Sequence, residues 1–250
     1  MSELLGLYAL WLREVKVYSR ERSRIASSVF TPILWLFVFG KGLGATISIG
    51  GLAYDIFLYP GIIAMSTLFT SLFFGVYIVW DKRVDFLKEV LVSPLSRTTV
   101  FLGKVLGGMT DTIIQVTILL LLAPFLGISI GPRTIVLIYG TVFFLSLGIV
   151  SIGLIIGSVM ESPEGFGLVV SFVAYPLFFL SGALFPIWNL PPWLRAFVML
   201  DPVTYGVDAL RTVILGGGAI PLEVSFAVLT AFSAAMVYIG TKAFERMKAY

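Results

Sequence analysis

The chain has no cysteine and no histidine among its 250 residues. These absences exclude disulfides, thiolate chemistry, imidazole metal ligands and histidine proton relays. Charge is scarce as well: charged residues make up 12% of the chain, hydrophobic residues 58%, and the mean hydropathy is +1.02. A soluble domain usually carries about 25% charged residues. The composition therefore predicts an integral membrane protein.

The sequence also lacks a catalytic or nucleotide-binding motif. Gly103-Lys104 has neither the glycine spacing nor the following hydroxyl of a phosphate-binding loop. Lys41 and Asp111 lie within the apolar runs but near the ends of their runs, whereas ion-coupled pumps usually bury carboxylates near the bilayer midplane. We therefore expect no enzyme activity, cofactor or metal in this chain. Its net charge of +3 gives no reason to expect a nucleic-acid partner.

Long apolar runs define the expected topology. A charge at the bilayer centre costs roughly 2.5 to 3.5 kcal/mol, so runs of about 20 nearly uncharged residues predict spanning helices. Six runs meet this description, at about residues 25–45, 58–80, 107–128, 134–157, 165–185 and 222–241. We predict a single domain, residues 1–250, that is an all-α integral membrane protein with six transmembrane helices.

Basic residues predict the orientation. Five of the 17 lysines and arginines precede residue 25, five lie in residues 81–104, and three follow residue 241. Short loops rich in lysine and arginine stay in the cytoplasm, so both termini and the 81–104 loop are expected there. The first residues show no cleavage pattern of a secretory signal. We expect a multi-pass protein of the plasma or inner membrane.

Residues 1–24 have the periodicity of an amphipathic helix. Its apolar positions are Leu4, Leu7, Tyr8, Trp11, Val15 and Tyr18. We expect an interfacial helix with Trp11 and Tyr18 at the level of the lipid headgroups. It either serves only as an anchor or also contacts a cytoplasmic partner.

Residues 81–104 form a polar loop between two apolar runs. A short amphipathic helix is predicted over residues 84–92, with Phe86 and Val90 on one side, and Pro94 ends it. The loop mixes three acidic residues with five basic residues, which favours a protein interface, because topology alone requires only bases. The alternative is that these charges serve topology only.

Proline and glycine mark local features of the spans. Pro32 lacks the amide that would bond the carbonyl of Ser28, so the first span is expected to kink. Gly153 and Gly157 have the spacing that allows close helix packing, which we expect within the subunit.

Residues 186–221 are predicted to form two short extracytoplasmic helices that are re-entrant or interfacial. Asp201 and Pro202 suit the start of the second helix, and glycines from Gly216 end it. Asp208 and Arg211 are three residues apart, and we expect a structural ion pair between them rather than a substrate contact.

Two passages carry a family resemblance. Residues 88–106, KEVLVSPLSRTTVFLGKVL, and residues 180–211, LSGALFPIWNLPPWLRAFVMLDPVTYGVDALR, resemble the membrane subunits of type-2 exporters of the ATP-binding-cassette class. The matching positions are Glu89, Pro94, Ser96, Arg97, Gly103, Lys104, Ser181, Gly182, Pro186, Pro191, Pro202, Tyr205, Asp208 and Arg211. The order and number of spans agree, so the resemblance covers essentially the whole chain.

The resemblance implies a permease that pairs with a second copy or a related permease and docks on a cytoplasmic ATPase, which binds ATP and magnesium. Coupling to the ATPase is assigned to Asp85, Phe86, Lys88, Glu89 and Arg97. Glu161 and Glu164 would form a smaller second cytoplasmic contact. Aromatic residues of span five either line the path or pack against neighbours and lipid; they are Phe172, Tyr175, Phe178 and Phe179.

The expected substrate is hydrophobic or amphipathic, such as a drug, a lipid or a lipid-linked glycan, because the spans contain so few charges. An ATP-independent channel or facilitator is the main alternative, and the coupling-like loop disfavours it. A lipid-modifying membrane enzyme is less compatible with the sequence, which offers no histidine, cysteine or buried pair of acids.

Overall fold

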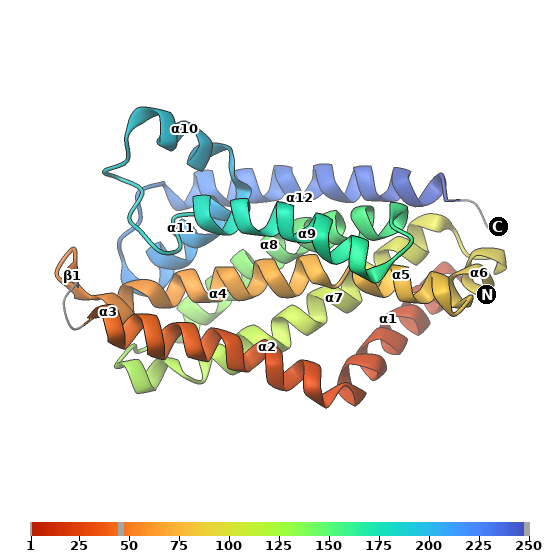
Figure 1. Ribbon diagram of the computed structural model, residues 1–250, viewed down its shortest axis with the longest axis horizontal. Helices are drawn as coiled ribbons and strands as arrows, with labels where there is room; N and C mark the ends of the chain where they lie inside the picture. The colour runs from red at the N-terminus through yellow and green to blue at the C-terminus, as the bar shows by residue number, and fades with distance from the viewer. Residues whose placement is uncertain (1, 45–47, 248–250) are drawn as a thin grey trace.

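The computed structural model describes residues 2–44 and 48–247 and is mostly helical (Figure 1). Residue 45, at the predicted end of the first span, and Lys248 lie outside the described residues. The first half contains α1 (Glu3–Arg20), α2 (Arg22–Leu34), the π-helix η1 (Trp35–Lys41), α3 (Gly42–Gly44), β1 (Ser48–Ile49), β2 (Leu52–Ala53), α4 (Tyr54–Phe73), α5 (Val76–Arg83), α6 (Phe86–Val92) and α7 (Arg97–Leu120). The second half contains the 3-10 helix η2 (Ala123–Leu126), α8 (Pro132–Val159), α9 (Pro163–Leu180), α10 (Pro192–Leu200), α11 (Pro202–Leu215) and α12 (Leu222–Glu245).

Five stretches of helix are long and apolar enough to cross a membrane. Among the described residues, these are Ile25–Gly44, Tyr54–Arg83, Pro132–Val159, Pro163–Leu180 and Leu222–Glu245. The third predicted span overlaps α7, which has 24 residues but is more polar than the five. The structure thus supports a helical membrane protein, and the sixth span stays a prediction.

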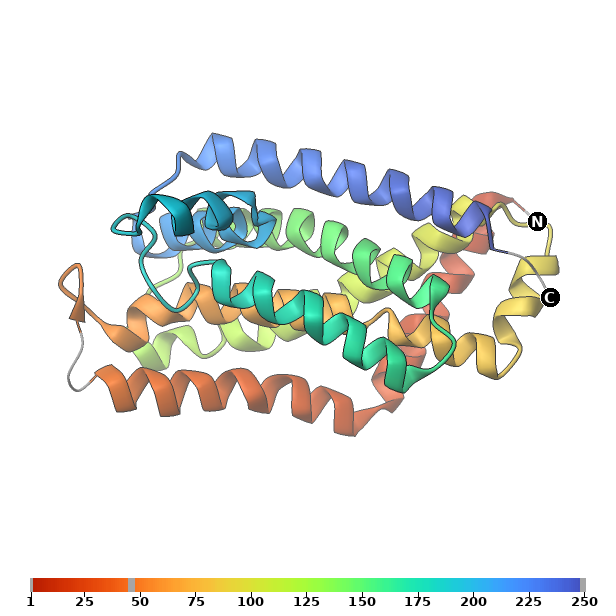
Figure 2. The same ribbon diagram turned by 45° about the horizontal axis from the view of Figure 1, so that its top comes forward.

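The long helices run side by side along the molecule, with α4 and α8 near its centre (Figures 1 and 2). In α4, 16 of 20 residues are buried. The start of α1, helix α6 and the end of α12 lie at one end of the bundle, which we call the α6 end. The β1–β2 hairpin, α10 and α11 lie at the opposite end, which we call the α11 end.

Glycine packing joins α8 to the break between α4 and α5. A Cβ atom on Gly153 would overlap the carbonyl of Leu72, and one on Gly157 would overlap the carbonyl of Gly75. Only glycine allows the backbones to approach this closely. The predicted packing of these glycines within the subunit is therefore confirmed.

The α11 end contains both predicted short helices. The Asp201 side chain accepts a hydrogen bond from the amide of Val203 at the start of α11, and Gly216 ends the helix with φ of 77°. The predicted ion pair between Asp208 and Arg211 is wrong. The Asp208 carboxylate instead accepts bonds from the amides of residues 219 and 220, while Arg211 donates to the carbonyl of Gly182.

Helix α1 packs on α7. Its buried residues are Gly6, Leu10, Glu14 and Tyr18, whereas Leu4 and Tyr8 of the predicted apolar stripe are exposed. The side chain of Tyr18 is buried within the protein, and its expected level at the lipid headgroups stays a prediction. Trp11 donates a hydrogen bond to Thr110 of α7 over 2.9 Å.

Candidate functional site

Helix α6 lies at the α6 end as a separate seven-residue helix. Asp85 precedes it with φ of 58°, a left-handed conformation that turns the chain sharply after α5. The helix ends at Val92, two residues before Pro94, as predicted. Lys88 forms an exposed ion pair with Asp85 over 2.7 Å. The turn and the proline together limit α6 to about two turns.

Two side chains attach α6 to the rest of the bundle. Leu87 is buried and belongs to a small apolar core that also contains Leu10 and Phe101. The guanidinium of Arg13 lies over the ring of Phe86, 3.7 Å from its centre. Glu89 lines a groove of about 350 Å³ between α6 and α1. A displacement of α6 would therefore act directly on α1.

Arg13 also belongs to a cluster of four charges that joins three helices. Lys104 of α7 binds Glu14 of α1 over 2.6 Å and also binds Asp81 of α5, and Arg13 binds Asp81 over 2.7 Å. The Lys104 side chain is 1% exposed. Burial lowers the pKa of Arg13, but the hydrogen bond and charge of Asp81 outweigh this effect and leave the pKa above its ordinary value. Mutual pairing is what makes these buried charges tolerable.

The start of α7 is held by α1. The carboxylate of Glu3 accepts bonds from the backbone amide and hydroxyl of Ser96 and from the hydroxyl of Thr99. The hydrogen bond from Thr99, followed by the one from the Ser96 amide, lowers the pKa of Glu3. Arg97, assigned to coupling, is the first residue of α7, and its buried Nη1 atom has no hydrogen-bond partner among the described residues.

The loop between α8 and α9 meets α5. Lys82 donates to the carbonyls of Gly157, Ser158 and Met160 at the end of α8, where a cation complements the helix dipole. Arg83 approaches Glu164 to 3.6 Å. Glu161 lies in the same loop, so the two expected cytoplasmic contacts, α6 and residues 158–165, are connected through α5.

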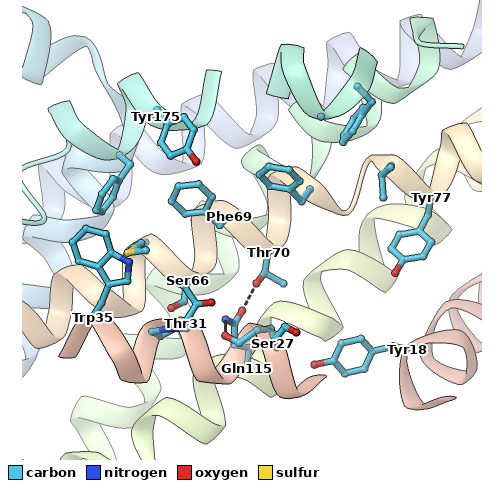
Figure 3. A pocket seen from close by; sticks show the side chains of 18 of the residues that line it. Tyr18, Ser27, Thr31, Trp35, Ser66, Phe69, Thr70, Tyr77, Gln115 and Tyr175 are labelled. Atoms are coloured by element: carbon cyan, nitrogen blue, oxygen red, sulfur yellow. Dashed lines mark hydrogen bonds between the residues drawn. The ribbon is translucent and has the colours of Figure 1, made fainter. Parts of the chain in front are cut away.

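A cavity of about 740 Å³ lies between α2, α4 and α9 (Figure 3). One side is aromatic, with Trp35, Phe69 and Tyr175 prominent in Figure 3, and the other side carries hydroxyl and amide groups. Tyr18 and Tyr77 line one of its ends. Within the described residues, the lining consists of Tyr18, Ser27, Ser28, Thr31, Pro32, Trp35, Met65, Ser66, Phe69, Thr70, Phe73, Val76, Tyr77, Gln115, Pro163, Phe166, Gly167, Tyr175, Phe178 and Phe179.

The polar side of the cavity is organised by Gln115 of α7. Its amide donates to the carbonyl of Ser28 over 2.5 Å, and its side-chain oxygen accepts a bond from the hydroxyl of Thr70 (Figure 3). Ser28 has the carbonyl that Pro32 leaves without a helical partner. Gln115 thus connects the first apolar helix to α4.

Three of the four aromatic residues proposed for the path line the cavity, namely Tyr175, Phe178 and Phe179. Phe172 is 82% exposed and lies outside the lining. The sequence reasoning did not identify Gln115, although a glutamine in an apolar run and the unpaired carbonyl before Pro32 were visible signals. The cluster around Lys104 was also missed, because its members are far apart in the sequence.

Comparison with known proteins places the chain among transport permeases. A family model described as ABC-2 type transporter matches residues 6–215. The putative transport permease ycf38 of Cyanophora paradoxa is 29% identical over 210 residues, covering 82% of this chain and 72% of that protein. The inner membrane transport permease YadH of Escherichia coli is 28% identical over 254 residues, covering 97% of this chain and 95% of that protein. Nodulation protein J of Neorhizobium galegae is 24% identical over 219 residues, covering 86% of this chain and 83% of that protein.

Proposed function

The chain belongs to the ABC-2 type transporter family, and we propose that it forms the membrane path of an exporter driven by a separate cytoplasmic ATPase. In this proposal α7 is the third of six spans, both termini and α6 face the cytoplasm, and two copies or two related permeases complete the path. ATP and magnesium bind to the partner. The chain itself contributes movement, not hydrolysis.

The attachment of α6 is the observation that carries the proposal. Phe86 contacts Arg13, and Arg13 belongs to the buried cluster shared by α1, α5 and α7. A force applied to α6 therefore reaches three helices through short, charged contacts. Lys88 and Glu89 are exposed on the helix, where a partner can reach them.

The cavity supports an apolar or amphipathic cargo. It lies between helices long enough to cross a membrane, and nine of its 20 described lining residues are aromatic. Tyr175, Phe178 and Phe179 are proposed as part of the path. Drugs, lipids and lipid-linked glycans all have apolar portions that such a wall can contact.

The test is purification of the tagged chain from native membranes in mild detergent, with ATPase activity measured on the eluate. We expect a roughly equimolar ATPase subunit. Reversing the exposed charges with Lys88→Glu and Glu89→Lys should remove most of the bound ATPase without unfolding the permease. The matched control is Lys242→Glu with Glu245→Lys, which reverses an exposed pair on α12.

Normal ATPase recovery with the α6 reversal would refute the coupling assignment. Complete absence of an ATPase from every mild preparation would refute the ATP-driven exporter and favour an ATP-independent channel or facilitator.

A further inference from the structure

The cavity contains an acceptor group that the helix cannot satisfy by itself. Pro32 has no amide hydrogen, so the carbonyl of Ser28 is available to a partner other than the helix backbone. Directly beyond α2 the chain continues as the π-helix η1, and π-helical turns often occur at functional sites. In this structure the side-chain amide of Gln115 donates a hydrogen bond to the Ser28 carbonyl.

Gln115 presents two hydrogen-bonding functions beside the cavity. Its amide nitrogen donates a hydrogen bond to the carbonyl of Ser28. Its oxygen accepts one from the hydroxyl of Thr70, which also lines the cavity. Ser66, one turn before Thr70, donates its hydroxyl to the carbonyl of Ile62 and retains acceptor capacity. These groups can exchange internal hydrogen bonds for bonds to a hydroxylated molecule at little net cost, because donors and acceptors are replaced in kind.

None of the described lining residues is charged. A charged head group entering this space would lose hydration without meeting an opposite charge, which is strongly unfavourable. The nearby acid Glu21 is outside the lining and accepts a hydrogen bond from Tyr77 over 2.6 Å. The chemistry of the lining therefore favours a neutral polar group.

The opposite wall provides apolar contact. The Phe69 ring packs edge-on against Tyr175 at 5.9 Å and Phe178 at 5.8 Å, and Trp35 packs against Phe178 at 5.7 Å. Such a surface accepts hydrocarbon chains and the C–H faces of sugars. The volume of about 740 Å³ is within the range of sites for drug-sized ligands, so it holds a head group and part of a tail.

We propose that this cavity binds an amphipathic molecule with a neutral, hydroxyl-bearing head group, and that Gln115 and the Ser28 carbonyl recognise that head group. The tail lies along Trp35, Phe69 and Phe178. This inference names a substrate class for the path proposed above, and so rests on that function. It assigns selectivity to the polar wall and general affinity to the aromatic wall.

The test measures quenching of Trp35 fluorescence in the full chain held in lipid nanodiscs. Three amphiphiles share one dibrominated alkyl chain and differ in the head group: glucoside, trimethylammonium and sulfate. Bromine quenches a tryptophan that it contacts. Subtracting the signal of Trp35→Phe, which keeps the other four tryptophans, isolates Trp35. Concentrations are expressed as bilayer-bound amphiphile per lipid, which corrects for differences in partitioning among the three amphiphiles.

We expect half-maximal quenching by the glucoside at about tenfold lower concentration than by either charged amphiphile, because a charged head group buried without a counter-charge loses more than one hydrogen bond's worth of affinity. Gln115→Leu should reduce this preference at least fivefold. Pro32→Ala supplies the missing amide to Ser28 and should reduce it as well, while making the helix more regular. Thr117→Val is the matched control on α7, since Thr117 does not line the cavity.

Equal quenching by all three amphiphiles would overturn the inference, as would an unchanged preference in both Gln115→Leu and Pro32→Ala. The assay needs no ATPase, so these results would leave the exporter function standing. Failure to recover an ATPase would refute that function and leave the binding preference measurable.

Discussion

The two ends of the bundle bury charged side chains in opposite ways. At the α6 end, Lys104 of α7 bonds to both Glu14 of α1 and Asp81 of α5. At the α11 end, Asp208 and Arg211 are equally buried but bond to backbone groups. The ion pair of the exposed Lys41 with the buried Asp55 is the exception there.

This difference separates two uses of charge. Side-chain pairs between distant segments join helices that could otherwise shift relative to one another. Asp208 instead fixes the turn just beyond its own helix, and Arg211 bonds α11 to the backbone that follows α9. Charge at the α6 end therefore joins helices to one another through paired side chains, and charge at the α11 end fixes backbone segments. Substitutions at each end should have different costs.

The largest effect is expected from Lys104→Met. It leaves the carboxylates of Glu14 and Asp81 buried with only Arg13 as a partner, and should lower the free energy of unfolding by about 3 to 5 kcal/mol. Thermal unfolding of the purified protein in detergent measures this. Lys88→Met, which removes an exposed pair, should cost at most about 1 kcal/mol. Equal costs would mean that the cluster does not stabilise the fold.

A smaller and pH-dependent effect is expected from Asp201→Asn. Burial raises the pKa of Asp201 to about 7, against a smaller lowering by the Val203 amide, and its Oδ2 atom has no partner. Because the folded pKa is above the unfolded value near 4, the wild-type protein loses stability as the pH rises from about 4 to about 7.

Asparagine can still cap α11 and does not ionise. Between pH 5 and pH 8, the free energy of unfolding of the variant should therefore rise relative to that of the wild type by on the order of 2 kcal/mol. Unfolding midpoints at the two pH values measure the gain. A difference between the proteins that does not change with pH would contradict the raised pKa.

The smallest effect is expected from Arg211→Met. The substitution loses one hydrogen bond to Gly182 and a contact with Phe57. It also removes a buried cation whose Nε and Nη1 atoms have no hydrogen-bond partner in the part of the chain that the structure describes. These terms oppose each other, so the net change should be within about 1 kcal/mol. Arg195→Met on α10, where the side chain is exposed, is the control. If Arg211→Met lowered the free energy of unfolding as much as Lys104→Met does, buried charge would contribute equally to stability at both ends of the bundle.

Local features of the fold were predictable from the sequence. The proline after α6 and the aspartate cap of α11 each involve neighbouring residues, so their physics can be read directly. The start of α6 was placed wrongly: Asp85, expected inside a helix over residues 84–92, has a left-handed conformation, and the helix begins at Phe86. The Ser28 carbonyl was likewise predicted to lack a helical partner. That Gln115 supplies the partner depends on how α7 packs beside α2, which periodicity does not specify.

The errors arose where tertiary contacts compete with local ones. The amphipathic pattern of α1 predicted an interfacial helix, but it could not show that the face containing Glu14 is buried on α7, where Lys104 is its partner. Asp208 and Arg211 have the spacing of a helical ion pair, yet the Asp208 carboxylate accepts hydrogen bonds from two backbone amides beyond α11 instead. A side-chain pattern on one helix cannot reveal the groups that another segment brings to it.

The contacts of α1 have a consequence for synthesis. Glu14 meets Lys104 across 90 residues, and Glu3 meets Ser96 and Thr99 across 93 and 96. As the chain leaves the ribosome, α1 is made first but lacks the α7 partners of Glu3 and Glu14 until α7 has emerged. The helices of residues 25–83 must therefore enter the membrane before α1 settles. In the interval α1 rests on the bilayer, where its exposed leucines and cations suit a lipid surface.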